Sequence, residues 1–271
     1  MNTLEKYFSG EVLIGDDYCN DELAAWYEDE KEGYANLGAR NQSEYTYKYN
    51  ALNKICAFNH IDLPNNCSVL GFGAAYGDEL VPIVDKASFV YITDPSDEFR
   101  GQSHPFLGDV KWLKTNILNT IDLKDNTLDC ITCLGVLHHI PNVSSVVAEM
   151  YRVLKPGGIL VVREPIVSMG DWRNVRPGLT KRERGIPLKV FKNIISETKF
   201  TVLKRSLCLF SGFQWICHKM FGREYAVYNN NFLTRVDMLL CFFFSFRSKS
   251  YHRTNKFSKF GPTNVYFVLR K

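Results

Sequence analysis

The chain has 271 residues, 45% of them hydrophobic and 23% charged, so it can bury a full core as one large domain or as one domain with an insertion. This composition excludes a disordered or fibrous chain. The net charge of +4 conceals a gradient, because residues 1–50 carry 11 acids and 4 bases, whereas the residues after Asp237 carry seven Lys and Arg and no acid. The basic end either favours an anionic partner or forms an ordinary solvated surface.

The start of the chain and its cysteines bear on the compartment. The sequence begins Met1-Asn-Thr-Leu-Glu-Lys, without a basic stretch followed by an apolar run, so no secretory signal is predicted. The eight cysteines are scattered, and the one C-x-x-C pair, Cys130 and Cys133, falls inside an apolar run. We expect these two thiols to be core side chains rather than metal ligands, and we expect a reducing, cytoplasmic compartment.

Hydrophobic patterning predicts an alternation of strands and helices. After an acidic, tyrosine-rich opening segment, short apolar runs that end in glycine, proline or aspartate alternate with amphipathic stretches. The predicted strands are 68–72, 88–93, 110–113, 128–134, 158–163, 200–205 and 264–269. The predicted helices are 44–58, 78–86, 143–154 and 186–198. Such an alternation implies a mostly parallel sheet with helices on both faces.

An aromatic-rich insertion, residues 207–262, separates the sixth and seventh predicted strands. Its most apolar run, 238–246, is far shorter than the ~20 apolar residues that cross a bilayer. We expect a buried helix that caps the substrate; the alternative is a membrane-surface element, which would place the protein peripherally at the inner face of the membrane. The predicted divisions are a helical N-terminal cap (1–64), a central α/β domain (65–206 and 263–271) and this insertion.

The sharpest local feature is Val69-Leu-Gly-Phe-Gly-Ala-Ala-Tyr-Gly77, in which a strand runs into a turn of small residues and a helix follows. Small side chains let the backbone approach a ligand, and the helix N-terminus offers free N–H groups. Asp94 comes 21 residues after Gly73, at the tip of the next strand, where a carboxylate can accept both hydroxyl hydrogens of a ribose. The alternative interpretation of Asp94 is a turn residue before Pro95.

A third feature narrows the class of protein. Asp129 opens the fourth strand, which leads to Gly135-Val-Leu-His-His139, and the next helix ends in Leu154-Lys-Pro-Gly-Gly158, a turn that reverses the chain into a strand. Together with the glycine-rich turn and Asp94, these stretches resemble the ordered motifs of class I S-adenosylmethionine-dependent methyltransferases. The resemblance covers about residues 65–170. It implies a seven-stranded, mostly parallel Rossmann-like sheet with an antiparallel last strand, and S-adenosyl-L-methionine as the cofactor.

The resemblance also assigns cofactor-binding positions. Asp94 would take the ribose, Asn116 would lie beside the adenine amino group, with Ile117 as an alternative alignment, and the backbone of Leu134 would meet the amino-acid end. The full set is Gly71, Gly73, Ala75, Gly77, Asp94, Asn116 and Leu134. Gly71 departs from the family, which usually has Asp or Glu there to hold the cofactor's ammonium group. Asp78, Glu79 or backbone carbonyls are the candidate substitutes, and no metal ligand is predicted.

In methyl transfer the protein does not have to activate the methyl group, because a methyl group on a sulfonium is already electrophilic. The chain has to hold the acceptor atom in line at ~3 Å and, for a hydroxyl, remove its proton. His139 is the preferred base, with His138 beside it, because both follow the fourth strand at the rim where an acceptor would arrive; a hydrogen-bonding loop histidine is the alternative. Glu164 is the second candidate base or orients a histidine. Arg163 either binds the substrate or pairs with Glu164.

Loop 171–185 carries five basic and two acidic side chains beside the expected substrate entrance. Arg can clamp a carboxylate or phosphate with two parallel hydrogen bonds, so the loop predicts an anionic acceptor; a solvated basic loop is the alternative. The candidate clamps are Arg173, Arg176, Arg182 and Arg184. The stretches 163–165 and 182–187 also resemble methyltransferases encoded among bacterial surface-polysaccharide enzymes.

The expected function is therefore methyl transfer to a small molecule, first of all a hydroxyl of a sugar or glycan intermediate. The alternatives are a quinone or natural product as acceptor, or a non-catalytic binding module, which Gly71 favours. A nicotinamide-dependent oxidoreductase is disfavoured because Tyr76 stands where Gly-x-Gly-x-x-Gly/Ala requires a small residue. Nucleic acid is disfavoured because the motif that cradles a flipped base is missing after the fourth strand. Protein methylation and the oligomeric state stay open.

Overall fold

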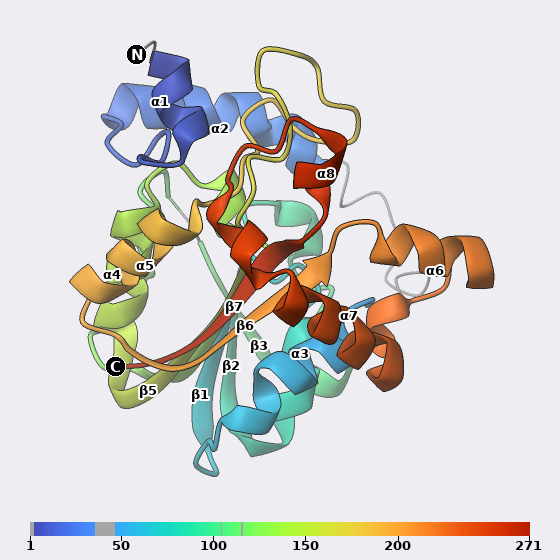
Figure 1. Ribbon diagram of the computed structural model, residues 1–271. Helices are drawn as coiled ribbons and strands as arrows, with labels where there is room; N and C mark the ends of the chain where they lie inside the picture. Colours follow the sequence, from blue (N-terminus) through green and yellow to red (C-terminus); the bar gives the residue numbers. More distant parts are fainter. Residues whose placement is uncertain (1–2, 36–46, 104, 115) are drawn as a thin grey trace.

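The computed structural model describes residues 3–35, 47–103, 105–114 and 116–271. These residues form a central seven-stranded sheet with the order β3-β2-β1-β4-β5-β7-β6 (Figure 1). The strands are β1 (Cys67–Phe72), β2 (Ala87–Thr93), β3 (Val110–Leu113), β4 (Leu128–Leu134), β5 (Leu154–Pro165), β6 (Thr201–Phe210) and β7 (Pro262–Arg270). Every predicted strand is present. The largest differences are an earlier start of β5 and an extension of β6 to Phe210.

Strand direction follows the expected pattern. All neighbouring pairs from β3 through β5 are parallel, whereas β7 lies antiparallel between β5 and β6. The predicted Rossmann-like sheet with an antiparallel last strand is therefore confirmed. Because the parallel strands all end at the same side, we call that side the carboxyl edge. In open α/β sheets ligands bind outside this edge.

The helices are α1 (Thr3–Ser9), α2 (Asn20–Ala35), α3 (Asn50–Cys56), α4 (Val143–Val153), α5 (Leu188–Glu197), α6 (Phe213–Phe221), α7 (Asn231–Phe243) and α8 (Lys256–Lys259). Two predicted helices differ. The helix over 78–86 is a 3-10 helix, η3 (Asp78–Lys86), with Pro82 inside it, which removes an N–H donor and disfavours an α-helix. Of the predicted helix 44–58, α3 covers the middle, and residues 44–46 lie outside the described residues.

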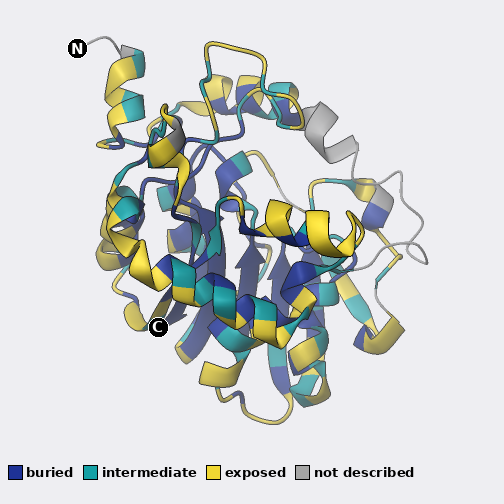
Figure 2. Cartoon of the chain, turned by 45° about the vertical axis from the view of Figure 1, so that its right-hand side comes forward, coloured by how far each residue is buried: buried dark blue, intermediate teal, exposed yellow. Residues whose placement is uncertain are grey.

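Helices cover both faces of the sheet, and the strands between them are buried (Figure 2). The core under α4 and α5 contains Leu70 and Ile131, and the core under α3, η3 and α7 contains Val69 and Cys130. Successive strand residues point to opposite faces. Cys130 and Cys133, three residues apart, therefore enter opposite cores, where both are buried free thiols. The prediction that they are core side chains is confirmed.

The N-terminal helices α1 and α2 lie over the carboxyl edge, beside loop 171–185 (Figure 1). Trp26 of α2 is 1% exposed, and its Nε1 donates to the backbone oxygen of His139 at 2.8 Å. Ser144, at the start of α4, donates its N–H and its hydroxyl to Asp16. The opening segment is thus bound to the chain that follows β4.

The insertion exposes the aromatic run that was expected to be buried. Helix α7 packs on β6 and α3 through a narrow inner stripe, in which Asp237 accepts the N–H groups of Leu209 and Phe210. Its outer face holds aromatic side chains that are 64–72% exposed, namely Phe232, Phe242 and Phe243. The expectation of a buried cap helix is therefore wrong for this face. In the described part of the chain, none of the helices has the length and apolar character needed to span a membrane.

Candidate active site

The glycine-rich turn and Asp94 meet at the carboxyl edge. Gly73, Ala75 and Gly77 all have positive φ, at 66°, 48° and 79°, so the turn coils tightly after β1. The N–H of Ala75 donates to Oδ2 of Asp94 at 3.0 Å, and the N–H of Ser96 donates to Oδ1 at 2.9 Å. Burial raises the pKa of Asp94 to about 6 against the effect of these two bonds. Each carboxylate oxygen keeps a further lone pair that can accept a ribose hydroxyl.

Gly71 has no room for a side chain. A Cβ at this position would lie 2.6 Å from the Cβ of Ala74, closer than packed atoms come. The Asp or Glu that class I methyltransferases usually have at this position is therefore incompatible with this turn. Glu79 of η3 instead reaches the same region: it is 5% exposed and accepts a hydrogen bond from Thr132, the β4 residue paired with Gly71. Burial raises the pKa of Glu79 to about 7.

Asn116 lies in the loop after β3 and closes a turn there. Its Oδ1 accepts the N–H groups of Leu118 and Thr120, at 3.0 and 3.1 Å. Its amide nitrogen donates to the hydroxyl of Thr120. Ile117, the alternative alignment, is 44% exposed. The Asn116 side chain is thus engaged with its own turn rather than turned toward Asp94.

Glu164 anchors the turn that carries the two histidines. It is fully buried, and its carboxylate accepts the backbone N–H groups of Val136, Leu137 and His138 at 2.8–3.2 Å. Nδ1 of His138 lies 2.8 Å from Oε2 of Glu164, and its Nε2 lies 3.4 Å from Glu183. Burial alone would lower the pKa of His138, but these two carboxylates outweigh it and raise the pKa to about 9. His138 is therefore a buried cation at neutral pH.

His139 is held differently. Its Nδ1 lies 3.0 Å from Oε2 of Glu30, a fully buried residue of α2, and 22% of its side chain is exposed. Glu30 also accepts the hydroxyl of Thr180 at 2.7 Å. Sequence reasoning missed Glu30, because nothing local to α2 marks it. One polar side-chain atom from each of His138, His139 and Glu183 lies within 4.8 Å of the others, a cluster that sequence analysis did not predict; the protonated state of His138 disfavours a metal ion there.

The four arginines of loop 171–185 have different surroundings. Arg184 is 1% exposed and donates to backbone oxygens of Ile14, Leu137, His138 and Pro141, so it joins the N-terminal segment to the histidine turn. Arg176 donates to three backbone oxygens of its own loop and to the backbone oxygen of Met169, which precedes the loop. Arg182 pairs with Asp29 at 2.7 Å. Arg173 pairs with Asp171 at 2.7 Å but keeps 63% of its side chain exposed.

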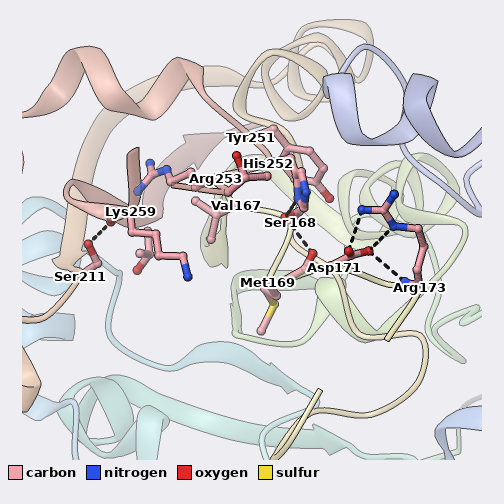
Figure 3. A pocket seen from close by; sticks show the side chains of 13 residues that line it. Val167, Ser168, Met169, Asp171, Arg173, Ser211, Tyr251, His252, Arg253 and Lys259 are labelled. Carbon is pink, nitrogen blue, oxygen red and sulfur yellow. Dashed lines mark hydrogen bonds and ion pairs between the residues drawn. The ribbon is translucent and has the colours of Figure 1, made fainter. Parts of the chain in front are cut away.

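A cavity of about 560 Å³ lies where β5 leaves the carboxyl edge and β7 enters it (Figure 3). Arg173 lines it together with two cations that sequence reasoning missed, Arg253 and Lys259. Inside it, the hydroxyl of Ser168 lies 2.8 Å from Nδ1 of His252. The cavity is therefore predominantly cationic, with Asp171 as its acid.

The central segment of the chain is similar to known proteins. Residues 70–162 match the family model of a methyltransferase domain. The ubiquinone/menaquinone biosynthesis C-methyltransferase UbiE of Marinomonas sp. (strain MWYL1) is 43% identical over 58 residues, which are 21% of this chain and 23% of that protein. The protein of the same name from Citrobacter koseri is 40% identical over 65 residues, or 23% of this chain and 26% of that protein. The chain thus spans about a quarter of the length of these curated relatives.

Solved structures match over more of the chain. An S-adenosylmethionine dependent methyltransferase from Mesorhizobium loti aligns with a TM-score of 0.51 and 12% identity, over 78% of this chain and 94% of that one. The [4+2]-cyclase SpnF aligns with a TM-score of 0.53 and 15% identity, over 90% and 94%. At these identities the likeness shows the fold alone, and one fold hosts different reactions. The methyltransferase domain that residues 70–162 match implies S-adenosyl-L-methionine as the cofactor.

The residues at the carboxyl edge fit this cofactor. The turn after β1 is a close-packed cradle, in which a Cβ at Gly73 would come within 2.5 Å of Val136. Beside it, Nε and Nη1 of Arg163 are buried and have no hydrogen-bond partner among the residues that the structure describes. A buried donor without an acceptor is rare in native proteins and points to a missing ligand. Asp94, the cradle and Arg163 offer partners for a ribose and for a carboxylate.

Proposed function

We propose that the chain transfers the methyl group of S-adenosyl-L-methionine to a small-molecule acceptor. The observation that carries the proposal is the hydrogen bond from the N–H of Ala75 to Asp94, at 3.0 Å. It sets a carboxylate and a nearly bare backbone turn side by side at the edge where α/β sheets bind nucleotides. The match of residues 70–162 to a methyltransferase domain supports the same conclusion.

The cofactor would supply a sulfonium methyl group that needs no further activation. The chain's own work is to hold the nucleoside, to orient the acceptor atom opposite the sulfur and to keep water out. Asp94 and the turn 73–77 would hold the nucleoside. Helix α2 and loop 171–185 cover the histidine turn, where Arg182 lies against Asp29 and Trp26.

We assign the proton-accepting role to His139. A sugar or alcohol hydroxyl has a high pKa, so its oxygen needs a base during the transfer. His138 is poorly suited, because a pKa of about 9 leaves it protonated at neutral pH. Glu164 is also poorly suited, because its carboxylate already serves three backbone N–H groups and His138. His139 has one nitrogen on Glu30 and keeps part of its side chain exposed.

The acceptor that we favour is a sugar or glycan intermediate with an anionic group. The cavity beside β5 and β7 supports this choice, because Arg173, Arg253 and Lys259 surround it. Guanidinium groups bind phosphate and carboxylate through paired hydrogen bonds. The hydroxyl to be methylated would then lie between this cavity and the cofactor.

A quinone or related natural product is the second candidate. Two observations favour it: the relatives that match are named C-methyltransferases of ubiquinone and menaquinone biosynthesis, and α7 exposes an apolar face. That face borders a basic segment, with Arg247 over the ring of Phe246 at 5.2 Å and with Lys249 exposed. We propose that this surface contacts the inner face of a membrane from the cytoplasm. Aromatic side chains and basic groups together suit an anionic bilayer.

Mass spectrometry with isotope-labelled cofactor tests the proposal. The purified protein is incubated with methyl-labelled S-adenosylmethionine and, separately, with nucleotide-linked sugars, lipid-linked sugars and demethylated quinols. We expect one labelled methyl group on one of these acceptors, and its loss in His139→Gln. The catalytic proposal is abandoned if the protein binds S-adenosylhomocysteine in a calorimeter but methylates none of them, because that result describes a binding module.

A further inference from the structure

The face of the sheet on which Gly71 lies carries a buried arginine and a buried glutamate. In the β1–β4 register Gly71 pairs with Thr132, and in the β4–β5 register Leu134 pairs with Arg163. Residues 71, 132, 134 and 163 all point to the same face, because alternate strand positions share a face. Glu79 reaches this face from η3 through its hydrogen bond with Thr132. A buried cation and a buried carboxyl group thus lie on one face beside the cofactor cradle.

Arg163 is a buried cation without an ion pair among the described residues. Its side chain is 7% exposed, and Nη2 donates to the backbone oxygen of Leu134 at 3.2 Å. Its guanidinium carbon lies 4.3 Å from the ring centre of Tyr49, so one face of the group is covered by a ring. The neighbouring acid, Glu164, points to the other side of the sheet and binds His138. Within the described part of the chain, Nε and Nη1 have no acceptor.

Such an arrangement is costly without a ligand. A buried charge is destabilising unless it is paired, and each unmet donor adds its own desolvation penalty. The contact between Arg163 and Leu134 also fixes where an anion would bind. Leu134 ends β4 next to the turn at Gly73, whose missing Cβ would lie against Val136. An anion that satisfies Arg163 would therefore lie beside the glycine-rich turn.

Glu79 is the complementary group. Its carboxylate is buried, and its hydrogen-bond partner among the described residues is Thr132. Arg163 lies close enough for its charge to act on Glu79, but the two do not form a direct ion pair within the part of the chain described. Both side chains therefore remain available to a ligand that carries a carboxylate and an ammonium group on the same carbon.

We propose that Arg163 and Glu79 form a subsite for the α-amino-acid end of the cofactor. Arg163 takes the α-carboxylate, and Glu79 takes the α-ammonium group that an acid at position 71 would otherwise hold. This proposal rests on the proposed function, since it names the residues that would bind the amino-acid end of S-adenosyl-L-methionine. It also separates Arg163 from the acceptor, whose anionic group would bind in the cavity lined by Arg173.

Calorimetry with three ligands tests the subsite. S-adenosylhomocysteine carries both charged groups, decarboxylated S-adenosylmethionine keeps the ammonium group, and 5′-methylthioadenosine has neither. We expect Arg163→Met to weaken S-adenosylhomocysteine about tenfold or more, as loss of a charge-assisted hydrogen bond would, and to leave the other two ligands unchanged. Glu79→Gln should weaken the two ligands that carry ammonium and leave 5′-methylthioadenosine unchanged. Arg205→Met, which alters an exposed arginine of β6 that has no assigned role, is the control.

Each other outcome counts against a specific claim. If Arg163→Met weakens all three ligands equally, or none of them, the subsite is refuted. If the wild-type protein binds S-adenosylhomocysteine no better than 5′-methylthioadenosine, the subsite fails while the proposed function survives; if it binds neither, the proposed function fails. Urea unfolding of the ligand-free protein supplies a second measurement, since Arg163→Met removes an unpaired buried charge and should raise the midpoint. A lowered midpoint would assign Arg163 to the fold instead.

Discussion

Glu30 of α2 and His139 after β4 are 109 residues apart in the sequence, yet Oε2 of Glu30 lies 3.0 Å from Nδ1 of His139. The contact orients the imidazole ring of His139 through its Nδ1. Because Glu30 also binds Thr180 and the N–H of Arg182, it joins the N-terminal cap, the histidine turn and loop 171–185. One buried carboxylate therefore binds both the covering loop and the base that we propose.

The first prediction concerns this pair. His139→Gln should lower kcat about 10²–10⁴-fold, the usual contribution of a positioned base, without changing affinity for S-adenosylhomocysteine. Glu30→Gln should lower kcat more than it changes KM, because it misorients the ring without touching the acceptor. Steady-state kinetics and calorimetry measure the two effects, with Glu28→Gln on the same helix as the control. Wild-type turnover in His139→Gln would remove this residue from the mechanism.

Glu164 should prove essential to stability. We expect Glu164→Ala to lower the free energy of unfolding by roughly 3–5 kcal/mol, because it leaves a buried His138 cation and three backbone N–H groups without their acceptor. Glu164→Gln, which keeps one acceptor oxygen, should cost less. Urea unfolding measures both, with the exposed Glu197→Ala as the control. A loss in Glu164→Ala no larger than in the control would contradict the assignment.

The stability contributed by His138 should depend on pH. Its pKa rises from 6.5 in the unfolded chain to about 9 in the folded protein, so the folded state binds the proton more tightly. The contribution, on the order of 3 kcal/mol, is complete below about pH 6.5 and is lost as pH rises through about 9. Unfolding free energies of wild type and His138→Gln should therefore converge at alkaline pH. A constant difference across that range would be evidence against a His138 cation.

Binding of the nucleoside should weaken in acid. The pKa of Asp94 is raised by burial to about 6, and only its ionised form accepts two ribose hydroxyls. We expect affinity for 5′-methylthioadenosine to fall about tenfold from neutral pH to about pH 5. This ligand lacks the ammonium group that we assign to Glu79, so titration of Glu79 does not enter. In Asp94→Asn the affinity for 5′-methylthioadenosine should be weaker by ~1–3 kcal/mol and independent of pH. If the variant keeps the pH dependence of the wild type, the ribose assignment is refuted.

The exposed aromatic face of α7 should bind anionic bilayers. We expect sedimentation with phosphatidylcholine vesicles only when they contain phosphatidylglycerol, and a weakening of about tenfold or more in Phe242→Ser with Phe243→Ser, since each buried ring contributes ~1.5–3 kcal/mol. Phe106→Ser, which alters a 73% exposed ring outside the insertion, is the control. If the double variant sediments like wild type, or if the wild type binds no vesicles but forms dimers, the membrane proposal fails.

Part of the candidate site could be predicted from the sequence. The turn from Val69 to Gly77 and the carboxylate of Asp94 were predicted together, because small residues after a strand and an acid at the next strand tip are local patterns. Other parts of the site could not be predicted. Arg163 was expected to bind the substrate or to pair with Glu164, but neighbouring positions of a strand alternate, so the two side chains point to opposite faces of the sheet. The aromatic run of α7 was wrongly expected to be buried for a related reason, since composition does not show which side of a helix packs against the rest of the protein.

Local hydrophobic periodicity was enough to predict the succession of strands and helices, and from it a mostly parallel sheet with a carboxyl edge. The charged side chains that meet at this edge became known from the packing of the folded chain. Glu30 reaches His139, and Glu79 reaches the strand position beside Gly71, because segments distant in the sequence are packed together. Such pairings leave no periodic signal in either segment, since each depends on the shape of the other.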